Sequence, residues 1–364
     1  MTRNASLPMY NLPEMRPANT QFWEALRGLL VRAGLDDVPG TLQFDRPPVP
    51  ERIGPEVLFS QTCGYPLETI FSAQAVRLGT PCYDAPGCDG PSHCGLFVVP
   101  AGSKVRELRD LRGGTFLLNH RYSNSGMNLP RRALAEIAGG CPLFANVVET
   151  GTQPGNLDRI ARAEADATAV DCVTFAFWSH YRPDAARQVR VLARTPPSPA
   201  IPFVTSTATP AATVEVLRAA LRELADNPCC AKARRGLLVT DIIDVPAAAY
   251  HGLLDYEREA AELGYPVLVL PKGGEADGQK CRSYTKGTAC RASRPLCRST
   301  RGLVSLWLRD SPRPALRAGA ATLSRRQRLD RPVRSARLDP RDCVHDVDPD
   351  NAGGQPHPGT LPRD

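Results

Sequence analysis

Three short segments of the chain combine small hydroxyl and amide side chains with the expected start of a helix. They are Ser60-Gln61-Thr62-Cys63-Gly64, Ser123-Asn124-Ser125-Gly126-Met127-Asn128 and Asp171-Cys172-Val173-Thr174. The N-terminus of a helix offers backbone N–H donors without partners and about half a positive charge. A negatively charged small molecule satisfies both without a Lys or Arg side chain. The three segments therefore predict a site for a small oxyanion.

Several of these residues have both a binding and a structural interpretation. Ser125 is expected to cap its helix and Gly126 to let a ligand approach the backbone closely; an ordinary helix cap is the alternative. Asp171 either caps the next helix or accepts a hydrogen bond from a protonated phosphate or an ammonium group. Tyr10 either forms a wall of the site or is an ordinary buried tyrosine. The predicted ligand-binding residues are Tyr10, Ser60, Gln61, Thr62, Tyr83, Ser123, Asn124, Ser125, Gly126 and Asp171.

The elements that would position these residues alternate between apolar strands and amphipathic helices, which predicts an α/β fold. Strands are expected at residues 5–9, 57–61, 74–81, 95–99, 115–119, 146–149, 167–170, 189–193 and 203–206. Helices are expected at residues 19–33, after 62–66, within 103–113, from the 123–127 segment to 138, and at 156–162, 173–179, 210–225 and 247–263. In open α/β sheets ligands bind beyond the carboxyl ends of strands, where helices begin. The three polar segments lie at such junctions.

Five motifs, in the order of the chain, resemble those of one protein family. They are Ser6-Leu7-Pro8-Met9-Tyr10, Leu58-Phe59-Ser60-Gln61-Thr62-Cys63-Gly64-Tyr65-Pro66-Leu67, Gly79-Thr80-Pro81-Cys82-Tyr83-Asp84, Ser123-Asn124-Ser125-Gly126-Met127-Asn128 and Ala169-Val170-Asp171-Cys172-Val173-Thr174. The family is the PhnD-like family, the substrate-binding proteins of phosphate/phosphonate ABC transporters. The resemblance covers about residues 4–270 and implies a two-lobed type II periplasmic-binding-protein fold. One lobe would contain about residues 1–90 and 195–270 and the other about residues 91–194, joined by crossing strands near 83–94 and 191–197.

The resemblance also implies how a ligand is held. Family members hold ligand oxygens with hydroxyl and amide groups at the helix start that matches Ser123 to Gly126. Cleft carboxylates, matched here by Asp171, bind the amine of aminophosphonates, and many members carry a histidine where this chain has Gln153. We therefore expect two lobes to close by a hinge on a phosphate, a phosphonate or a similar oxyanion. The resemblance implies an ABC permease as a possible partner, and no cofactor, metal or chemistry on the ligand.

Two other functions remain open on the same fold. Cys63 and Cys172 each lie at an expected helix N-terminus, which lowers a thiol pKa, so either could be an enzyme nucleophile. His93 and His120 are the histidines nearest the expected site. Fast, ligand-protected labelling of one cysteine would favour the enzyme. Alternatively, the domain could sense a ligand within a regulatory assembly.

Three cysteines near the first of the two expected crossing strands are evenly spaced. Cys82, Cys88 and Cys94 are separated by five residues each, which differs from the paired CxxC of zinc sites. They are therefore expected to be reduced thiols. A disulfide or a metal loop among them is the alternative.

The last quarter of the chain differs in composition from the rest. Residues 273–364 carry 18 Lys and Arg against 10 Asp and Glu, whereas residues 1–272 carry 27 against 28. Only 13 of those 92 C-terminal residues are Leu, Ile, Val or Phe, too few to form a packed core. A disordered basic tail is expected, and translation of out-of-frame DNA fits the same composition. Its Arg residues would attract nucleic acid only non-specifically.

The N-terminal sequence has no apolar signal segment. No stretch reaches the roughly 18 apolar residues that would span a bilayer. The chain as written is therefore expected to stay in the cytoplasm, without membrane insertion. A true start further upstream would make a periplasmic location the expectation instead.

Overall fold

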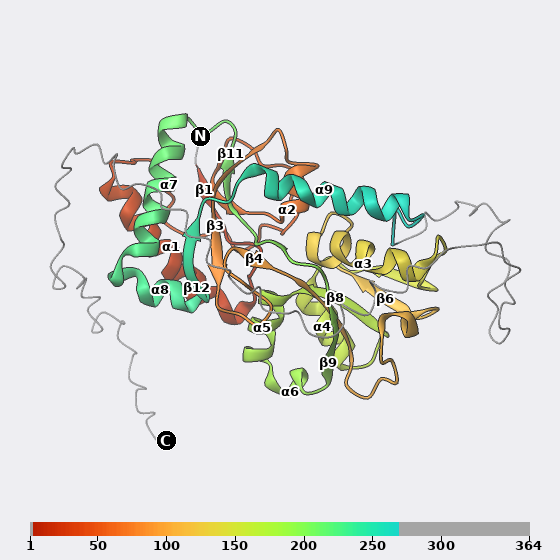
Figure 1. Cartoon of the computed structure of the whole chain (residues 1–364). Helices are drawn as coiled ribbons and strands as arrows, with labels where there is room; N and C mark the ends of the chain where they lie inside the picture. The colour runs from red at the N-terminus through yellow and green to blue at the C-terminus, as the bar shows by residue number, and fades with distance from the viewer. Residues whose placement is uncertain (1–2, 269–364) are drawn as a thin grey trace, which may run out of the picture. The chain divides into compact units, whose positions relative to one another are not determined.

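The structure, a computed structural model, describes residues 3–268, which lie within the first of two compact units, Met1–Asp277. The predicted disordered tail at 273–364 lies outside the described residues. Within residues 3–268 the chain forms two five-stranded sheets, each accompanied by helices (Figure 1).

The first sheet contains strands from both ends of the described chain. In spatial order they are β1 (Asn4–Ala5), β2 (Val57–Gln61), β11 (Phe203–Ser206), β3 (Ala75–Tyr83) and β12 (Val239–Ile243). β1 is parallel to β2, whereas β11 is antiparallel to both β2 and β3, and β12 is antiparallel to β3. Because β11 follows the whole second sheet in the sequence, the first sheet is completed only when the chain returns.

The second sheet is built from the middle of the chain. In spatial order its strands are β7 (Asn146–Glu149), β6 (Thr115–Leu118), β8 (Ala167–Asp171), β5 (Gly95–Pro100) and β9 (Val189–Arg194). β6 is parallel to β7 and β8, and β5 is antiparallel to β8 and β9. Between the sheets, β4 (Ser92–His93) pairs antiparallel with β10 (Ser198–Pro199). The two segments that connect the sheets therefore pair with each other.

Three helices gather around the first sheet (Figure 1): α1 (Arg16–Arg32), α7 (Ala211–Asp226) and α8 (Ala231–Gly236). The predicted apolar face of α1 is confirmed, because its large apolar side chains are buried: Phe22, Trp23, Leu26, Leu29 and Leu30. Phe22 stacks on Phe203 of β11, which stacks on Phe59 of β2. This aromatic contact joins the helix to the centre of the sheet.

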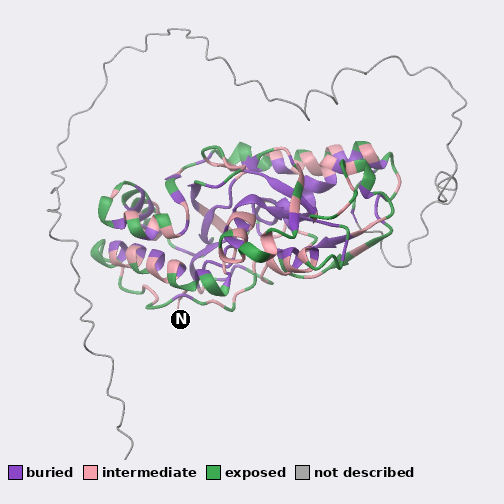
Figure 2. Cartoon of the chain, turned by 90° about the horizontal axis from the view of Figure 1, so that it is seen from below, coloured by how far each residue is buried: buried purple, intermediate pink, exposed green. Residues whose placement is uncertain are grey.

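The helices near the second sheet are α3 (Leu129–Ala138), α4 (Gln153–Ala161), α5 (Cys172–Tyr181) and α6 (Pro183–Ala186). A π-helical turn, η3 (Asn124–Asn128), runs directly into α3. Helix α9 (Ala247–Glu262) extends from α2 (Gly64–Glu68) to α3 along the top of Figure 1. Short 3-10 turns occur at η1 (Pro13–Met15), η2 (Leu108–Leu111) and η4 (Pro228–Cys230). Figure 2 shows that the strands are mostly buried, whereas the outer helices alternate between buried and exposed residues.

Several predicted boundaries are wrong for identifiable reasons. The first strand ends at Ala5 rather than residue 9. Helix α1 begins at Arg16 rather than residue 19, with Pro17 in its first turn, where a missing N–H does no harm. β3 continues to Tyr83, and α8 and β12 were not predicted. Among residues 3–268, no helix is long and apolar enough to cross a membrane.

Candidate functional site

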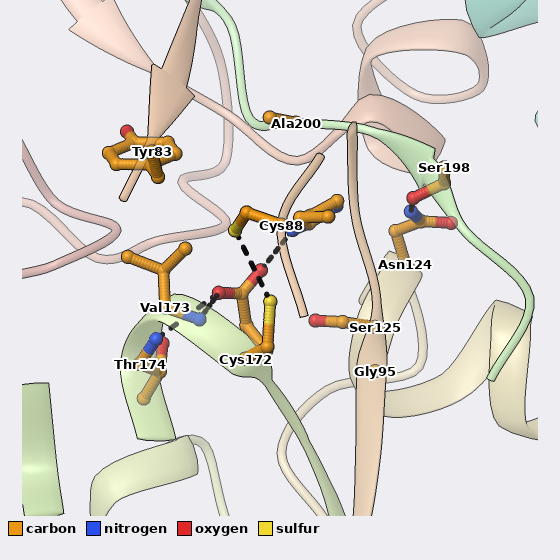
Figure 3. A network of polar contacts seen from close by, with 12 residues as sticks. Tyr83, Cys88, Gly95, Asn124, Ser125, Cys172, Val173, Thr174, Ser198 and Ala200 are labelled. Carbon is orange, nitrogen blue, oxygen red and sulfur yellow. Dashed lines mark hydrogen bonds and ion pairs between the residues drawn. The ribbon is translucent and has the colours of Figure 1, made fainter. Parts of the chain in front are cut away.

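Asp171, the last residue of β8, lies at the centre of a buried polar cluster. Its Oδ1 accepts hydrogen bonds from the backbone N–H groups of Val173 (2.8 Å) and Thr174 (3.2 Å), visible at the start of α5 in Figure 3. The Tyr10 hydroxyl donates to the same oxygen at 3.2 Å, and Oδ2 pairs with Nδ1 of His93. Of the two interpretations of Asp171, the helix cap is the one that the structure contains.

His93, on β4, provides the charge that balances Asp171. The side chain is 1 % exposed, and burial disfavours a charged imidazole. The negative charge of Asp171 and its hydrogen bond outweigh burial and raise the pKa of His93. Among the described residues, Nε2 of His93 has no hydrogen-bond partner. The pair therefore forms a buried ionic contact with one imidazole nitrogen left for another group.

Tyr10 connects this carboxylate to the first sheet. Its ring packs edge-to-face on Tyr83, with 5.4 Å between centroids, and contacts Phe177 of α5 at 5.8 Å. Burial, and then the charge of Asp171, raise the pKa of Tyr10 well above its ordinary value. The hydroxyl is therefore a permanent donor to Asp171. The Tyr83 hydroxyl in turn lies 3.5 Å from Nε2 of Gln61.

The second polar segment forms the turn η3, and its capping residue differs from the predicted one. Ser123, not Ser125, is the N-cap, because its hydroxyl accepts the N–H of Gly126 at 3.0 Å. The turn is π-helical, with Asn128 N–H bonded to the Ser123 carbonyl. Ser125 is thus free of the capping role and lies inside the cluster with no exposed surface.

A side chain at position 126 would collide with a neighbouring side chain unless the neighbour moved. A Cβ atom at Gly126 would lie 2.0 Å from Oδ1 of Asn119, the residue that follows β6. Asn119 Oδ1 is itself buried and has no hydrogen-bond partner within residues 3–268. In this structure the Asn119 amide lies where a Cβ atom of residue 126 would be, and close approach of a ligand to the Gly126 backbone stays a prediction.

Gln153, the first residue of α4, joins the second and third segments. Its Nε2 donates to Oγ of Ser125 at 3.1 Å, and its Oε1 accepts the backbone N–H of Asp171 at 2.8 Å. The sequence resemblance singled out this position only because a histidine is common there. The structure shows that the amide fixes Ser125 and Asp171 at a set separation.

The first polar segment, Ser60 to Gly64, contacts the same cluster through Cys63. Burial raises the pKa of Cys63 to about 12, although a hydrogen bond from the backbone of Asn124 opposes this effect. Thr62 is fully buried, and no described residue offers its Oγ1 a hydrogen bond. Ser60 remains within the first sheet, where its hydroxyl lies 2.9 Å from that of Ser6.

The three segments therefore meet. Cys63 contacts Asn124, and Gln153 links Ser125 to Asp171. The Asn124 amide also donates to Ser198 Oγ of β10 at 3.0 Å (Figure 3). All ten predicted ligand-binding residues are buried. A cavity of about 310 Å³ lies elsewhere, between α7, β3 and β12, and none of these ten residues lines it.

Three polar contributors to this cluster were not among the predicted ligand-binding residues: His93, Asn119 and Gln153, of which Gln153 was noted only as the position of a family histidine. His93 was considered only as a base for an enzyme, and its partner is far away in the sequence. Asn119 follows directly after strand β6, and Gln153 follows the capping residue Thr152. These positions are the sequence signal by which the two residues could have been found. Within residues 3–268, no group of three or more His, Cys, Asp or Glu side chains has the arrangement of a metal site.

Comparison with known proteins identifies the relatives of this domain. Residues 83–250 match the family model described as ABC transporter, phosphonate, periplasmic substrate-binding protein. These residues are similar to that family of phosphonate-binding proteins. The predicted resemblance to PhnD-like proteins is thereby confirmed, and the match takes in the whole second sheet with β10 and β11. No curated protein sequence matches the chain.

Solved structures share the fold of this domain. XAC2383 from Xanthomonas citri bound to ATP has 17% identity and a TM-score of 0.53, covering 72% of this chain and 98% of that chain. Its chloride-bound form gives a TM-score of 0.55 at 17% identity, covering 72% and 99%. A binding protein component of an ABC phosphonate transporter from Pseudomonas aeruginosa has 15% identity and a TM-score of 0.53, covering 72% and 96%. The predicted type II periplasmic-binding-protein fold is confirmed.

Proposed function

We propose that this phosphonate-binding domain takes up a small phosphorus oxyanion, phosphate or a phosphonate, at the buried cluster and does no chemistry on it. The partner would be an ABC permease that receives the ligand. The observation that carries the proposal is the meeting of three strand-to-helix junctions at Cys63–Asn124 and Ser125–Gln153–Asp171. The similarity of residues 83–250 to a phosphonate-binding family supports the same ligand class.

The chemistry of the cluster suits an anion that contributes acceptors and a hydroxyl. Thr62 Oγ1 is buried and lacks a partner among the described residues, so it can donate to a ligand oxygen. His93 Nε2 is a second such donor when the ring is protonated. Charge-assisted hydrogen bonds of this type are about twice as strong as neutral ones.

The hydrogen bonds that the Asp171 carboxylate already makes affect which phosphonates can bind. In the family, a carboxylate at this position receives an amine. Here Oδ1 already accepts three hydrogen bonds and Oδ2 faces His93. An added ammonium group would compete with the imidazolium for the same oxygen. We therefore favour ligands without an amine, such as phosphate or methylphosphonate, over aminoethylphosphonate.

Access to the cluster requires the two sheets to separate. Tyr10 on the first-sheet side bonds Asp171 on the second, and Asn124 bonds Ser198. Both contacts are buried and join segments that lie far apart in the sequence. A hinge motion that breaks them and reforms them around the ligand gives the open and closed states.

The test is calorimetry on the full chain with phosphate, methylphosphonate, aminoethylphosphonate, sulfate and ATP; ATP is included because the Xanthomonas protein binds it. Ser125→Ala should weaken phosphate or methylphosphonate binding by about 1–2 kcal/mol, or about fivefold to thirtyfold. Ser72→Ala, at an exposed hydroxyl, is the matched control. Equal affinities of the two variants would mean that the ligand binds elsewhere. Binding of ATP alone would contradict the proposal that the ligand is phosphate or a small phosphonate.

A thiol enzyme is the competing proposal, and the structure favours Cys172 over Cys63 for it. Cys63 stays protonated, with a pKa of about 12. Hydrogen bonds from Cys88 and Cys94 lower the pKa of Cys172, and His93 adds to the effect. Rapid iodoacetamide labelling of Cys172 that phosphate suppresses, together with turnover of a phosphonate, would support the enzyme.

A further inference from the structure

Three thiols gather beside the proposed ligand-binding cluster, and the proposed binding of an oxyanion does not use them. Sγ of Cys88 lies 3.6 Å from Sγ of Cys172, the first residue of α5 (Figure 3). Cys94 is also in contact, since the backbone N–H of Cys172 donates to its carbonyl at 3.0 Å. Cys82, which the sequence grouped with Cys88 and Cys94, lies on β3 instead. The structure therefore replaces the sequence-adjacent grouping by a pair 84 residues apart.

We propose that Cys88 and Cys172 form a modification site: a dithiol that a hydroperoxide converts into a disulfide. The two sulfur atoms are already in contact, and closing the bond requires them to approach to about 2.05 Å. The two sulfur atoms are in direct contact, so no side chain lies between them.

The order of attack follows from the surroundings of each thiol. The Cys172 sulfur is in hydrogen-bond contact with that of Cys88 and lies at the N-terminus of a ten-residue helix, which lowers its pKa, so we assign the thiolate to Cys172. The pKa of Cys88 is raised, chiefly because its hydrogen-bonded neighbour is that thiolate. Cys172 is therefore the nucleophile and Cys88 the thiol that resolves the intermediate.

The reaction is balanced with hydrogen peroxide as the oxidant. The Cys172 thiolate attacks one peroxide oxygen, the O–O bond breaks, and a sulfenic acid and hydroxide form. The Cys88 sulfur then attacks the sulfenic sulfur, the S–O bond breaks, and water leaves with the Cys88 proton. The proton that Cys172 lost converts the hydroxide to a second water. Two thiols lose two electrons, which reduce the peroxide.

Backbone freedom favours Cys88 over Cys94 as the partner. The main chain of Cys94 is tied to Cys172, because the Cys172 backbone N–H donates to the Cys94 carbonyl. Cys88 lies on the connection between β3 and β4, is partly exposed, and follows Gly87, whose φ of 103° favours glycine. A Cβ at Gly87 would lie 2.9 Å from Sγ of Cys94, so the glycine also lets the thiols crowd together.

The bond would fasten the connection between the sheets to the residue after Asp171. If the proposed function holds, oxidation should therefore change the affinity for phosphate, because Asp171 and Tyr10 must separate for access. The chemistry of the pair does not depend on that function. If the disulfide forms and phosphate affinity does not change, the Cys88–Cys172 modification site is supported and only its effect on ligand binding is contradicted.

The experiment treats the reduced full chain with stoichiometric hydrogen peroxide, blocks remaining thiols, and maps peptides by mass spectrometry without reduction. We expect a Cys88–Cys172 cross-linked peptide that dithiothreitol removes. Cys82→Ser should keep this peptide, and Cys88→Ser should lose it. In Cys88→Ser, dimedone should trap a sulfenic acid on Cys172, which tests the pair even where the variant is less stable.

Three results would overturn the proposal. One is a Cys94–Cys172 peptide in place of the Cys88–Cys172 peptide. The second is an unmodified Cys172 at peroxide concentrations that oxidise the exposed thiols. The third is the same yield of cross-link in urea as in buffer, because the native contact would then have no influence on the pairing.

Discussion

The backbone N–H of Asp171 donates a 2.8 Å hydrogen bond to the side-chain oxygen of Gln153, eighteen residues earlier in the chain. The amide nitrogen of the same Gln153 side chain donates to Ser125 at 3.1 Å. One neutral amide thus holds the end of β8 against the turn before α3. A histidine, common at this position in the family, could not supply an acceptor and a donor in this geometry once it was protonated.

Gln153→Ala should therefore leave a buried N–H and a buried hydroxyl without their partners. We expect a loss of about 1–3 kcal/mol in the free energy of unfolding, the usual penalty for an unsatisfied buried group. Urea denaturation followed by circular dichroism measures it. Gln188→Ala, at an exposed side chain, is the control and should change stability little. Equal stability of both variants would show that the amide is not holding the two segments.

Tyr10→Phe removes the hydroxyl that reaches Asp171 from the first sheet while keeping the ring contacts with Tyr83 and Phe177. We expect a loss of about 1.5–3 kcal/mol of unfolding free energy, because the acceptor is a buried charged group. Tyr256→Phe is the matched control, since its hydroxyl donates to the Pro197 carbonyl at an exposed site. A loss for Tyr10→Phe no larger than for Tyr256→Phe would contradict the assigned hydrogen bond.

The parts of this site that the sequence predicted correctly are local. A run of apolar residues that ends in Ser60-Gln61-Thr62 or in Asp171 marks a strand followed by a helix, and both junctions are where they were expected. The capping role of Asp171 was one of two stated alternatives, since an N-cap needs only the two following residues. The prediction of Ser125 as the cap was wrong, because the helical turn begins at Asn124 and Ser123 caps it.

What could not be predicted depends on contacts distant in sequence. β12 begins after Leu238, whose φ is positive without a glycine to signal a turn, and it is held by pairing with β3. His93 becomes a partner of Asp171 only because β4 and β10 bring the connections between the sheets together. The same long-range packing, not the spacing of cysteines, selects Cys172 as the neighbour of Cys88.

The His93–Asp171 pair predicts how stability depends on pH. Burial opposes the charged ring, but the charge of Asp171 raises the pKa of His93 above its ordinary value of 6.5. The folded state therefore binds the proton more tightly than the unfolded state. The stabilisation is fully present below pH 6.5 and is lost as the pH rises through the raised pKa. Tyr10 and Cys172 also face this pair, and the charge near Cys172 adds to the same direction.

Urea denaturation of wild type and His93→Gln at pH values from 6 to 9 measures this effect. The difference in unfolding free energy should be largest at the acidic end and should shrink as the pH rises. His120→Gln is the control with the opposite sign, because burial lowers the pKa of His120 and that residue destabilises the fold as the pH falls. A pH-independent difference for His93→Gln would mean that folding does not shift the pKa of His93, and a difference that grows as the pH rises would mean that the ring is neutral in the folded protein.

Gly126 and Asn119 form the last pair that the structure makes testable. A methyl group at Gly126 would lie 2.0 Å from Oδ1 of Asn119, so Gly126→Ala should lose about 1–3 kcal/mol through overpacking. Gly252→Ala, within α9 and with open space around it, should instead gain about 0.5–1 kcal/mol from its higher helix propensity. Asn119→Ala combined with Gly126→Ala should recover most of the loss, because the double variant removes the amide that the methyl group meets. If the losses of the two single variants simply add in the double variant, the close approach of these two residues is not what requires the glycine.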